Sequence, residues 1–208
     1  MTEPVATFLS GRPTQQIAAE LLGKQLCLQT PTTALKVRIT ETEAYLGAID
    51  AGAHAYQNHR TDRNQALWSP AGTIYIYQMR AWCLLNIVTQ PADVPECVLI
   101  RGVEPVAGLA TMQANRPVAL TRLTDGPGKL MQALGLDKRL NGQRLNRSDL
   151  SLDLAAGWQP AHVSQTARIG IVGKGDWSTA PLRYYVTGNP YVSHVSRRSL
   201  DFDHRGWV

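Results

Sequence analysis

The clearest pattern of hydrophobic and polar positions covers residues 35–45. Side chains alternate there as in a β-strand, in which every second residue points to the same face. The odd-numbered face carries, in order, Leu35, Val37, Ile39, Glu41, Glu43 and Tyr45. Such a strand brings two carboxylates and a tyrosine to the edge of an apolar surface, where desolvation raises a carboxyl pKa unless a partner offsets it. The pattern therefore predicts a site at the end of this strand.

A second interpretation of the same stretch remains open. A β-bulge after Ile39 would turn Glu41 and Glu43 to solvent, and the hydrophobic pattern alone does not separate the two. The register of this strand therefore decides whether the carboxylates form a site.

Apolar spacing predicts the other elements. After Pro13 it predicts a helix that ends at Gly23, where glycine can adopt a left-handed cap. Further helices are expected over residues 106–113 and from residue 127 to about residue 135. Short apolar runs predict strands over residues 25–28, 72–77, 82–88, 97–101, 167–172 and 182–186.

These elements predict a single α+β domain over residues 1–208, with a curved, mainly antiparallel sheet, helices packed around it and a protruding β-hairpin. The 208 residues are enough for one substantial core, and no obvious linker divides them. Residues 199–208 are expected to form a frayed or loosely docked tail.

A polar loop over residues 47–70 is too long for a simple connection, and it carries His54 and His59. Loops of this kind usually bind something. In the strand that follows, Tyr75 and Tyr77 share one face. Both interpretations of these tyrosines stay open, because strand tyrosines either stack on a flat ligand or pack in a core.

Charge and cysteine usage narrow the function classes. Lys and Arg outnumber Asp and Glu by 21 to 16, which agrees with a polyanionic partner, although any one arginine is explained as well by ordinary solvated charge. Cys27, Cys83 and Cys97 are an odd number without C-x-x-C spacing and predict neither a disulfide framework nor a zinc site. With no apolar run long enough to span a bilayer, a soluble cytoplasmic protein is expected.

A carboxylate at a strand end, tyrosines on a second strand, a histidine-bearing loop and Arg101 closing a third strand describe a pocket for something flat, such as a nucleobase extruded from a duplex. At these residues the sequence resembles the alkyladenine, or methylpurine, DNA glycosylase family. The resemblance runs from about residue 8 to residue 195. It is carried by the order and spacing of Leu21-Leu22-Gly23, Glu41-Thr42-Glu43-Ala44-Tyr45, Ala53-His54, Arg63-Asn64, Pro70-Ala71-Gly72-Thr73-Ile74-Tyr75-Ile76-Tyr77, Val98-Leu99-Ile100-Arg101-Gly102-Val103-Glu104-Pro105, Asp125-Gly126-Pro127-Gly128-Lys129-Leu130 and Pro181-Leu182-Arg183-Tyr184-Tyr185.

The resemblance implies a monofunctional enzyme that flips a damaged purine out of double-stranded DNA and hydrolyses its N-glycosidic bond, without metal or organic cofactor. It makes Glu43 the general base for the attacking water and Arg101 the arginine that helps to hold this water. The aromatic walls of the pocket would be Tyr45, His54 and Tyr77, and Asn86 would lie on its floor. A carboxylate suits the reaction, because cleavage builds oxocarbenium character on the deoxyribose.

The hairpin departs from the family pattern. Between Tyr77 and Asn86 the chain is one residue shorter, and the tyrosine wedge expected there is absent. Arg80 takes its approximate place, with Met79 beside it. Met79, which is apolar and unbranched, is the preferred candidate for filling the vacated base position, whereas Arg80 could stack its guanidinium plane or pair with a phosphate. The alignment of Asn86 depends on where this gap is placed.

Lys129 follows Gly126-Pro127-Gly128 just inside a predicted helix, a place that favours phosphate contact. As an amine it could instead form a Schiff base with an abasic sugar. His54 and His59, five residues apart and without a cysteine partner, match metal-site spacings poorly, so no metal is expected.

Two rival functions fit parts of the same pattern. A non-catalytic nucleic-acid-binding module on the same scaffold would keep the aromatic pocket, but it has no need for Glu43 beside phosphates. A small glycoside hydrolase that uses Glu41 and Glu43 ranks low, because neighbours on one strand face cannot easily flank a bond. The expected partner is therefore duplex DNA that contains damaged purines, bound by a monomer.

Overall fold

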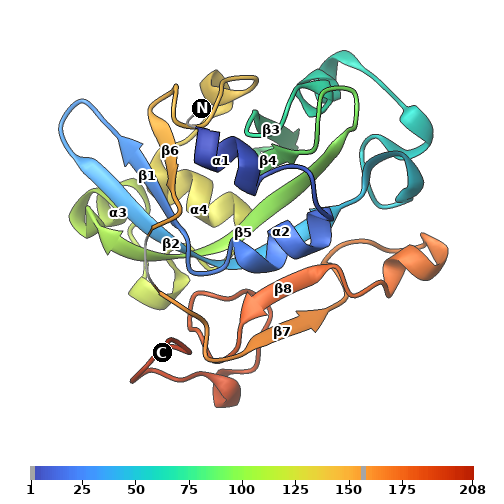
Figure 1. The fold of residues 1–208 in the computed structure, drawn as a ribbon. Helices are drawn as coiled ribbons and strands as arrows, with labels where there is room; N and C mark the ends of the chain where they lie inside the picture. The colour runs from blue at the N-terminus through green and yellow to red at the C-terminus, as the bar shows by residue number, and fades with distance from the viewer. Residues whose placement is uncertain (1–2, 156–157) are drawn as a thin grey trace.

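The computed structural model describes residues 3–155 and 158–208. Its centre is an eight-stranded antiparallel sheet with the path β3-β4-β5-β2-β1-β6, in which β8 pairs with β2 and β7 with β8 (Figure 1). The α+β class with a mainly antiparallel sheet is confirmed. The strands are β1 (Gln25–Gln29), β2 (Ala34–Tyr45), β3 (Ile74–Met79), β4 (Trp82–Thr89), β5 (Glu96–Ala107), β6 (Leu150–Asp153), β7 (Val163–Thr166) and β8 (Arg183–Val186).

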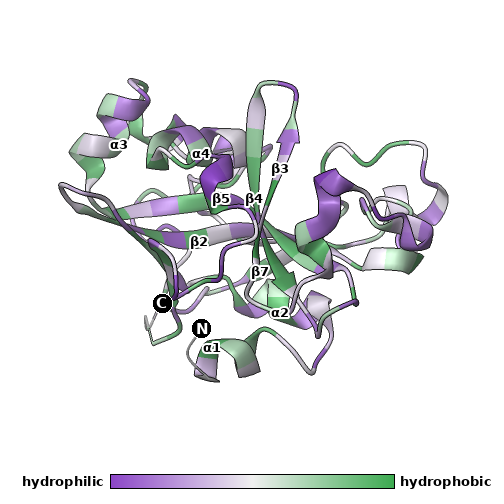
Figure 2. Ribbon diagram, turned by 90° about the horizontal axis from the view of Figure 1, so that it is seen from above, coloured by the Kyte–Doolittle hydropathy of each residue, from purple (hydrophilic) through white to green (hydrophobic). Residues whose placement is uncertain are grey.

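Helices cover both faces of the sheet. Seen from above, α1 and α2 lie on one side of β2 and β5, and α3 and α4 lie on the other (Figure 2). The α-helices are α1 (Glu3–Phe8), α2 (Thr14–Glu20), α3 (Leu109–Asn115) and α4 (Pro127–Leu134). The short 3-10 helices are η1 (Gly47–Ile49), η2 (Tyr56–Asn58), η3 (Asp62–Trp68), η4 (Leu120–Arg122), η5 (Lys138–Leu140), η6 (Gly175–Ser178) and η7 (Arg197–Ser199).

The register of β2 combines both interpretations of its sequence. β5 pairs along β2, while β1 pairs with its first half and β8 with residues 41–43. Between Ile39 and Glu41 the register against β5 shifts by one residue, which leaves Thr40 extra on β2, and directly afterwards Arg101 is extra on β5. The break therefore occurs where the sequence allowed it. It does not turn the carboxylates to solvent, because Glu41 and Glu43 are both fully buried.

Two apolar clusters position the site. The larger one packs α2, α4 and the first half of β2 around the sheet, and α4 ends at Gly135 with φ +66°, as its glycine predicts. The smaller one lies under the loop over residues 47–70 and joins Ala55, Leu67 and Trp68 to Tyr75 of β3 and Cys97 of β5. This loop is therefore anchored to the sheet although it has no strand of its own.

Some predicted elements were wrong. β5 continues to Ala107, so the helix predicted over residues 106–113 begins only at Leu109. Residues 167–172 form a loop and not a strand, and β7 at residues 163–166 pairs with β8 instead. The apolar run over these residues does not form a strand, because Arg168 is buried in an ion pair and Gly170 has φ +84°. Strand β6 was not predicted.

The C-terminal segment is docked and not loose. Trp207 is buried, and its indole N–H donates to Oε2 of Glu104 at 2.6 Å. Arg205 forms an ion pair with the same carboxylate at 2.8 Å. The prediction of a loosely docked tail over residues 199–208 is therefore wrong, because one buried tryptophan outweighs the polar composition around it.

Candidate active site

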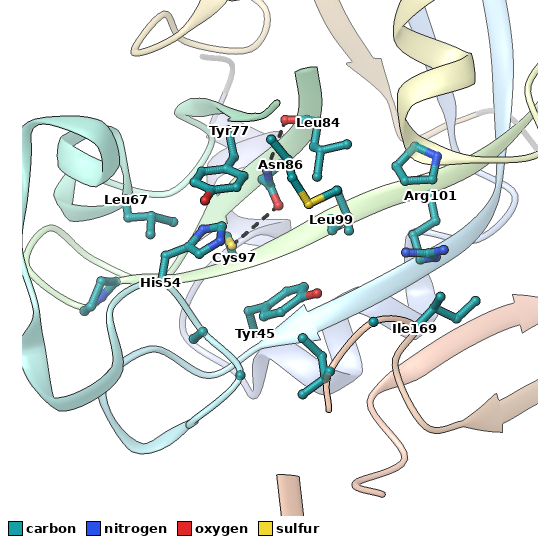
Figure 3. Close-up of a pocket in the computed structure, with 17 residues that line it drawn as sticks. Tyr45, His54, Leu67, Tyr77, Leu84, Asn86, Cys97, Leu99, Arg101 and Ile169 are labelled. Carbon is teal, nitrogen blue, oxygen red and sulfur yellow. Dashed lines mark hydrogen bonds between the residues drawn. The ribbon is translucent and has the colours of Figure 1, made fainter. Parts of the chain in front are cut away.

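A cavity of about 280 Å³ opens between the second half of the sheet, the loop after β2, the start of α4 and the loop after β7 (Figure 3). The pocket residues expected from the sequence come together here, since Tyr45, His54, Tyr77 and Asn86 all line it. Also in its lining are Met79, Leu84, Cys97, Leu99, Arg101, Pro127, Ile169, Gly170 and Ile171. The antiparallel pairing of β2, β5, β4 and β3 explains why residues distant in the sequence face one space.

Glu43 lies near the end of β2, fully buried. Its Oε1 accepts the backbone N–H of Ile169 at 2.8 Å, and its Oε2 accepts the hydroxyl of Tyr45 at 2.9 Å. Nη1 of Arg101 lies 3.4 Å from Oε1. Burial raises the pKa of Glu43, while Arg101 and the two hydrogen bonds oppose the rise. A carboxylate with a raised pKa is suited to accept a proton.

Arg101 is the extra residue of β5 at the register shift, and it is buried between two carboxylates. Its Nε donates to Oε1 of Glu41 at 3.0 Å, and its Nη2 donates to Oγ of Ser193 at 3.3 Å. Burial alone would lower the pKa of Arg101, but Glu43 and Glu41 outweigh it and raise the pKa. The guanidinium therefore stays charged beside Glu43.

His54 and Tyr77 form one aromatic wall. Their ring centroids are 3.8 Å apart and the rings are tilted by 30° (Figure 3). Nδ1 of His54 lies 3.0 Å from the hydroxyl of Tyr75, which is fully buried behind this wall and not in the cavity lining. Burial, followed by the nearby charge of Arg63, lowers the pKa of His54 to about 4. The imidazole is therefore neutral at physiological pH and presents an uncharged ring to the cavity.

Tyr45 approaches the cavity from β2 and is backed by a second arginine. The guanidinium carbon of Arg168 lies 4.6 Å from the centroid of the Tyr45 ring. Arg168 is itself fixed by Asp50, to whose Oδ1 its Nη2 donates at 2.8 Å, and its Nη1 donates to the backbone oxygen of Ala44 at 3.0 Å. Arg168 thus supports one face of the Tyr45 ring.

Asn86 of β4 lies buried in the cavity wall, with Leu99 as its register partner on β5. Its Nδ2 donates to the backbone oxygens of Tyr75 at 3.1 Å and Leu84 at 3.2 Å. Because both amide hydrogens are used, the orientation of the side chain is set and Oδ1 remains as an acceptor. Within the described part of the chain, the thiol of Cys97 donates weakly to this Oδ1 at 3.9 Å.

The β3–β4 hairpin projects from the body of the protein (Figure 2). Met79 pairs with Trp82 across a two-residue turn in which Arg80 has φ +54°. Met79 is 51% exposed and also lines the cavity. A Cβ on Gly128 would come within 2.7 Å of the Trp82 ring, so this ring packs closely on the first turn of α4 and braces the hairpin.

Lys129 lies in the first turn of α4 and forms an ion pair with Asp125 at 2.9 Å. It is not in the cavity lining. Arg80 is exposed at the hairpin tip and is not in the lining either. In the part of the chain that the structure covers, no group of three or more His, Cys, Asp and Glu side chains could hold a metal ion, and the three cysteines are free.

Sequence reasoning missed the residues that support this site from outside. Ile169 contributes a backbone N–H, which leaves no side-chain signal, and it lies where a strand was predicted. Asp50 and Arg168 carry no motif of their own. Arg183 lies within one of the segments that carry the family resemblance, and this was the one available signal for it.

Comparison with known proteins agrees with the geometry. The family model described as methylpurine-DNA glycosylase (MPG) matches residues 8–190. The chain belongs to the methylpurine-DNA glycosylase family. A relative from Lactiplantibacillus plantarum is 67% identical over 98% of both chains. One from Latilactobacillus sakei is 46% identical over 97% of this chain and 95% of its own, and one from Enterococcus faecalis is 42% identical over 100% and 90%. Each of these relatives bears the name "Putative 3-methyladenine DNA glycosylase".

Membership of the family gives the enzyme class, a DNA glycosylase that acts as a hydrolase, as the sequence resemblance implied. Among the described residues no helix is long and apolar enough to cross a membrane.

Proposed function

We propose that the protein removes alkylated and deaminated purines from duplex DNA by flipping the damaged nucleotide into the cavity and hydrolysing its N-glycosidic bond. The observation that carries the proposal is the buried Glu43 carboxylate, held by Arg101, Tyr45 and the Ile169 N–H beside an aromatic pocket. A base can enter a pocket of this kind only after it has left the duplex stack.

In the proposed reaction, Glu43 orients a water molecule and accepts its proton as the water attacks the anomeric carbon. Its negative charge also stabilises the oxocarbenium character that develops on the sugar. Arg101 helps to hold this water and opposes the rise that burial causes in the pKa of Glu43, since a cation next to an acid favours the charged form. One carboxylate thus serves both purposes.

The proposed substrates follow from the lining. Flat rings on both sides favour a planar base, and a purine alkylated at N3 or N7 carries a positive charge that electron-rich rings attract. Neutral lesions such as hypoxanthine lack this attraction and leave less readily. His54, with a pKa of about 4, is a poor donor of a proton to such a leaving group near neutral pH.

We further propose that the enzyme is monofunctional, acts as a monomer, and contacts DNA phosphates through Lys129. Lys129 is paired with Asp125 and lies outside the cavity lining, which argues against attack on the sugar carbon. The relatives are bacterial, so their DNA lies in the cytoplasm, and we propose the same compartment for this protein.

Single-turnover incubation with duplexes that each carry one lesion tests the proposal. The lesions are a methylated purine, hypoxanthine and ethenoadenine, and each product is analysed with and without alkali. We expect strand breaks only after alkali, which indicates an abasic site and no lyase step. Breaks without alkali would instead support Lys129 as a nucleophile, and Lys129→Met would then abolish them.

Glu43→Gln separates catalysis from binding. The amide keeps the shape of the side chain but cannot accept the proton, so we expect excision to fall by several orders of magnitude while binding to lesion-bearing duplex persists. Glu20→Gln, the same change at an exposed position, is the control. Wild-type protein that binds the duplexes but excises nothing would favour the rival proposal of a non-catalytic binding module.

A further inference from the structure

Four buried charged side chains form a chain of alternating sign beside the cavity, whose lining includes one of them, Arg101. Arg183 pairs with Glu41 at 2.6 Å, Glu41 with Arg101 at 3.0 Å, and Arg101 with Glu43 at 3.4 Å. The side chains of the two glutamates are 0% exposed and those of the arginines 6% and 7%. The group contains two positive and two negative charges, so it is neutral as a whole.

Glu41 is fully buried and is already bound by donors from three residues. Its Oε1 accepts from Nε of Arg101, from Nε of Arg183 at 2.6 Å and from Oγ of Ser193 at 2.9 Å. Its Oε2 accepts the backbone N–H of Ser193 at 2.8 Å. A carboxylate offers about four lone-pair sites, and four donors already surround this one, three of them at Oε1 and one at Oε2. Neither Glu41 nor Glu43 is among the residues that line the cavity, so the two acids differ in the number of donors that bind them and not in their place in the lining.

We propose that Glu41 is a positioning residue, which holds the Arg101 guanidinium in the plane that directs Nη1 to Glu43, and that Arg183 is the counter-ion that makes this possible. The proposal rests on the proposed roles of Glu43 and Arg101. Under this proposal Glu41 positions Arg101, whereas Glu43 is the general base.

Arg101 needs such a support for two reasons. Its side chain is long, and holding it in one rotamer costs conformational entropy, which the long contacts to Glu43 at 3.4 Å and to Ser193 at 3.3 Å offset only in part. It also sits at a register shift, where the regular ladder does not set the direction of its side chain. The Nε–H of a guanidinium points in one direction, so its bond to Glu41 fixes the orientation of the whole plane.

Arg183 makes the burial of Glu41 tolerable. Without it, the group would hold two carboxylates and one guanidinium away from water, and an unpaired buried charge is strongly destabilising. Strand β8 supplies Arg183 by pairing directly with β2, with Arg183 opposite Glu43 in the register. Its Nη2 donates to the backbone oxygen of Ser193 at 2.6 Å, and its guanidinium carbon lies 4.5 Å from the centroid of the Tyr185 ring.

The first test measures hydrogen exchange at Arg101 and does not depend on excision activity. In ¹⁵N-labelled full-length protein, the Nε–H of Arg101, assigned from Arg101→Lys, is expected to exchange slowly with water. In Glu41→Gln the weaker neutral acceptor should speed this exchange at least about 10-fold. Unchanged exchange in Glu41→Gln would overturn the proposal.

The second test is a kinetic double-mutant cycle under single-turnover conditions with Glu41→Gln, Arg101→Lys and the double variant. Because a small misplacement of a catalytic group is enough to cost much of the rate, Glu41→Gln should lower the excision rate about 10- to 100-fold, with the dissociation constant for lesion duplex unchanged. If Glu41 acts through Arg101, the double variant should be no slower than Arg101→Lys alone. Additive losses, or an unchanged rate in Glu41→Gln, would overturn the proposal.

A variant that preserves charge balance covers the case in which Glu41→Gln does not fold. Glu41→Gln combined with Arg183→Gln leaves Arg101 paired with Glu43 and no net charge in the group, and the same exchange and rate losses are expected from it. The proposed glycosylase function and the positioning role of Glu41 can each be refuted without the other. Wild-type protein without excision activity would remove the proposed function, whereas the Nε–H exchange would still decide whether Glu41 positions Arg101.

Discussion

The hydroxyl of Tyr45 donates a hydrogen bond of 2.9 Å to Oε2 of Glu43. The side chain expected to stack on the flipped base thus also holds the side chain expected to activate water. Both come from one face of β2, two residues apart, so a regular strand is sufficient to bring them together. Base binding and water activation are therefore linked through one phenol ring.

Tyr45→Phe isolates this link, because it removes the hydroxyl and keeps the ring. The lost hydrogen bond lowers the pKa of Glu43 in the wild type, so its removal raises this pKa further, and the acid limb of the single-turnover pH profile should move to higher pH. A hydrogen bond to a charged group contributes about 1.5–3 kcal/mol, which corresponds to a rate loss of roughly 10- to 100-fold.

The matched control is Tyr45→Ala, which loses both the hydroxyl and the stacking surface. It should weaken lesion binding in addition to slowing excision, whereas Tyr45→Phe should leave binding unchanged. If Tyr45→Phe shows the wild-type pH profile and rate, the hydrogen bond to Glu43 has no part in catalysis.

The buried pair of Asp50 and Arg168 should matter for stability and for activity. Asp50 accepts the backbone N–H groups of Leu46 and Gly52, and Arg168 precedes the residue that donates to Glu43. Asp50→Asn leaves the charge of Arg168 buried without its partner, which typically costs about 3–5 kcal/mol of unfolding free energy. Excision should also slow, because the loop that carries Ile169 loses its anchor.

Asp137→Asn is the control for this prediction. Asp137 pairs with Arg139 on the surface at 2.9 Å, where solvent screens the interaction. Urea unfolding should show a clear loss for Asp50→Asn and almost none for Asp137→Asn. Equal midpoints for the two variants would mean that the buried carboxylate of Asp50 contributes no more to stability than the exposed carboxylate of Asp137.

The sequence predicted those parts of the site that depend on local periodicity. Alternation over residues 35–45 placed Glu43 and Tyr45 together, and the same argument placed Tyr75 and Tyr77 on one face of β3. It could not choose between a continuous strand and a bulge, and the structure contains the bulge with the acids still buried. Their burial depends on Arg101 and Arg183 from other strands, which periodicity within β2 does not report.

The parts of the fold and of the site that the sequence did not predict depend on contacts between distant segments. The predicted strand over residues 167–172 failed because Arg168 finds its partner more than a hundred residues earlier, at Asp50. The C-terminal tail was misjudged for the same reason, since Glu104 in the middle of the chain binds Trp207. Asn86 entered the site prediction only through the family resemblance, because a strand asparagine has no local pattern of its own. Arg101 was noted from the sequence as the residue that closes a strand, and the resemblance alone gave it a role.

Asn86 is expected to exclude normal guanine. Its amide is fixed by the backbone oxygens of Tyr75 and Leu84, so it cannot turn away from the exocyclic amine that guanine carries and hypoxanthine lacks. Asn86→Ser should raise the excision of guanine relative to hypoxanthine in single-turnover assays. Asn115→Ser, outside the cavity lining, should leave this ratio unchanged, and an unchanged ratio in Asn86→Ser would exclude Asn86 from base selection.

The hairpin tip should hold the duplex open after the base has left it. Extruding a base costs a few kcal/mol of stacking and pairing, and a side chain that enters the gap recovers part of this cost. Met79 is exposed, apolar and at the edge of the cavity, and the neighbouring Trp82 is already packed on Gly128. Met79 is therefore the expected wedge, and Arg80 at the turn is the expected phosphate contact.

Two variants separate these roles. Met79→Ala should slow excision from duplexes far more than from single strands that carry the same lesion, because only the duplex has a gap to fill. Arg80→Asn, chosen because asparagine tolerates the φ of +54° at this turn, should weaken binding to all duplexes and reduce the slope of log affinity against log salt by about 1. Equal losses on both substrates for Met79→Ala would show that this side chain supports the pocket or the fold, and the wedge would then have to be sought at Arg80.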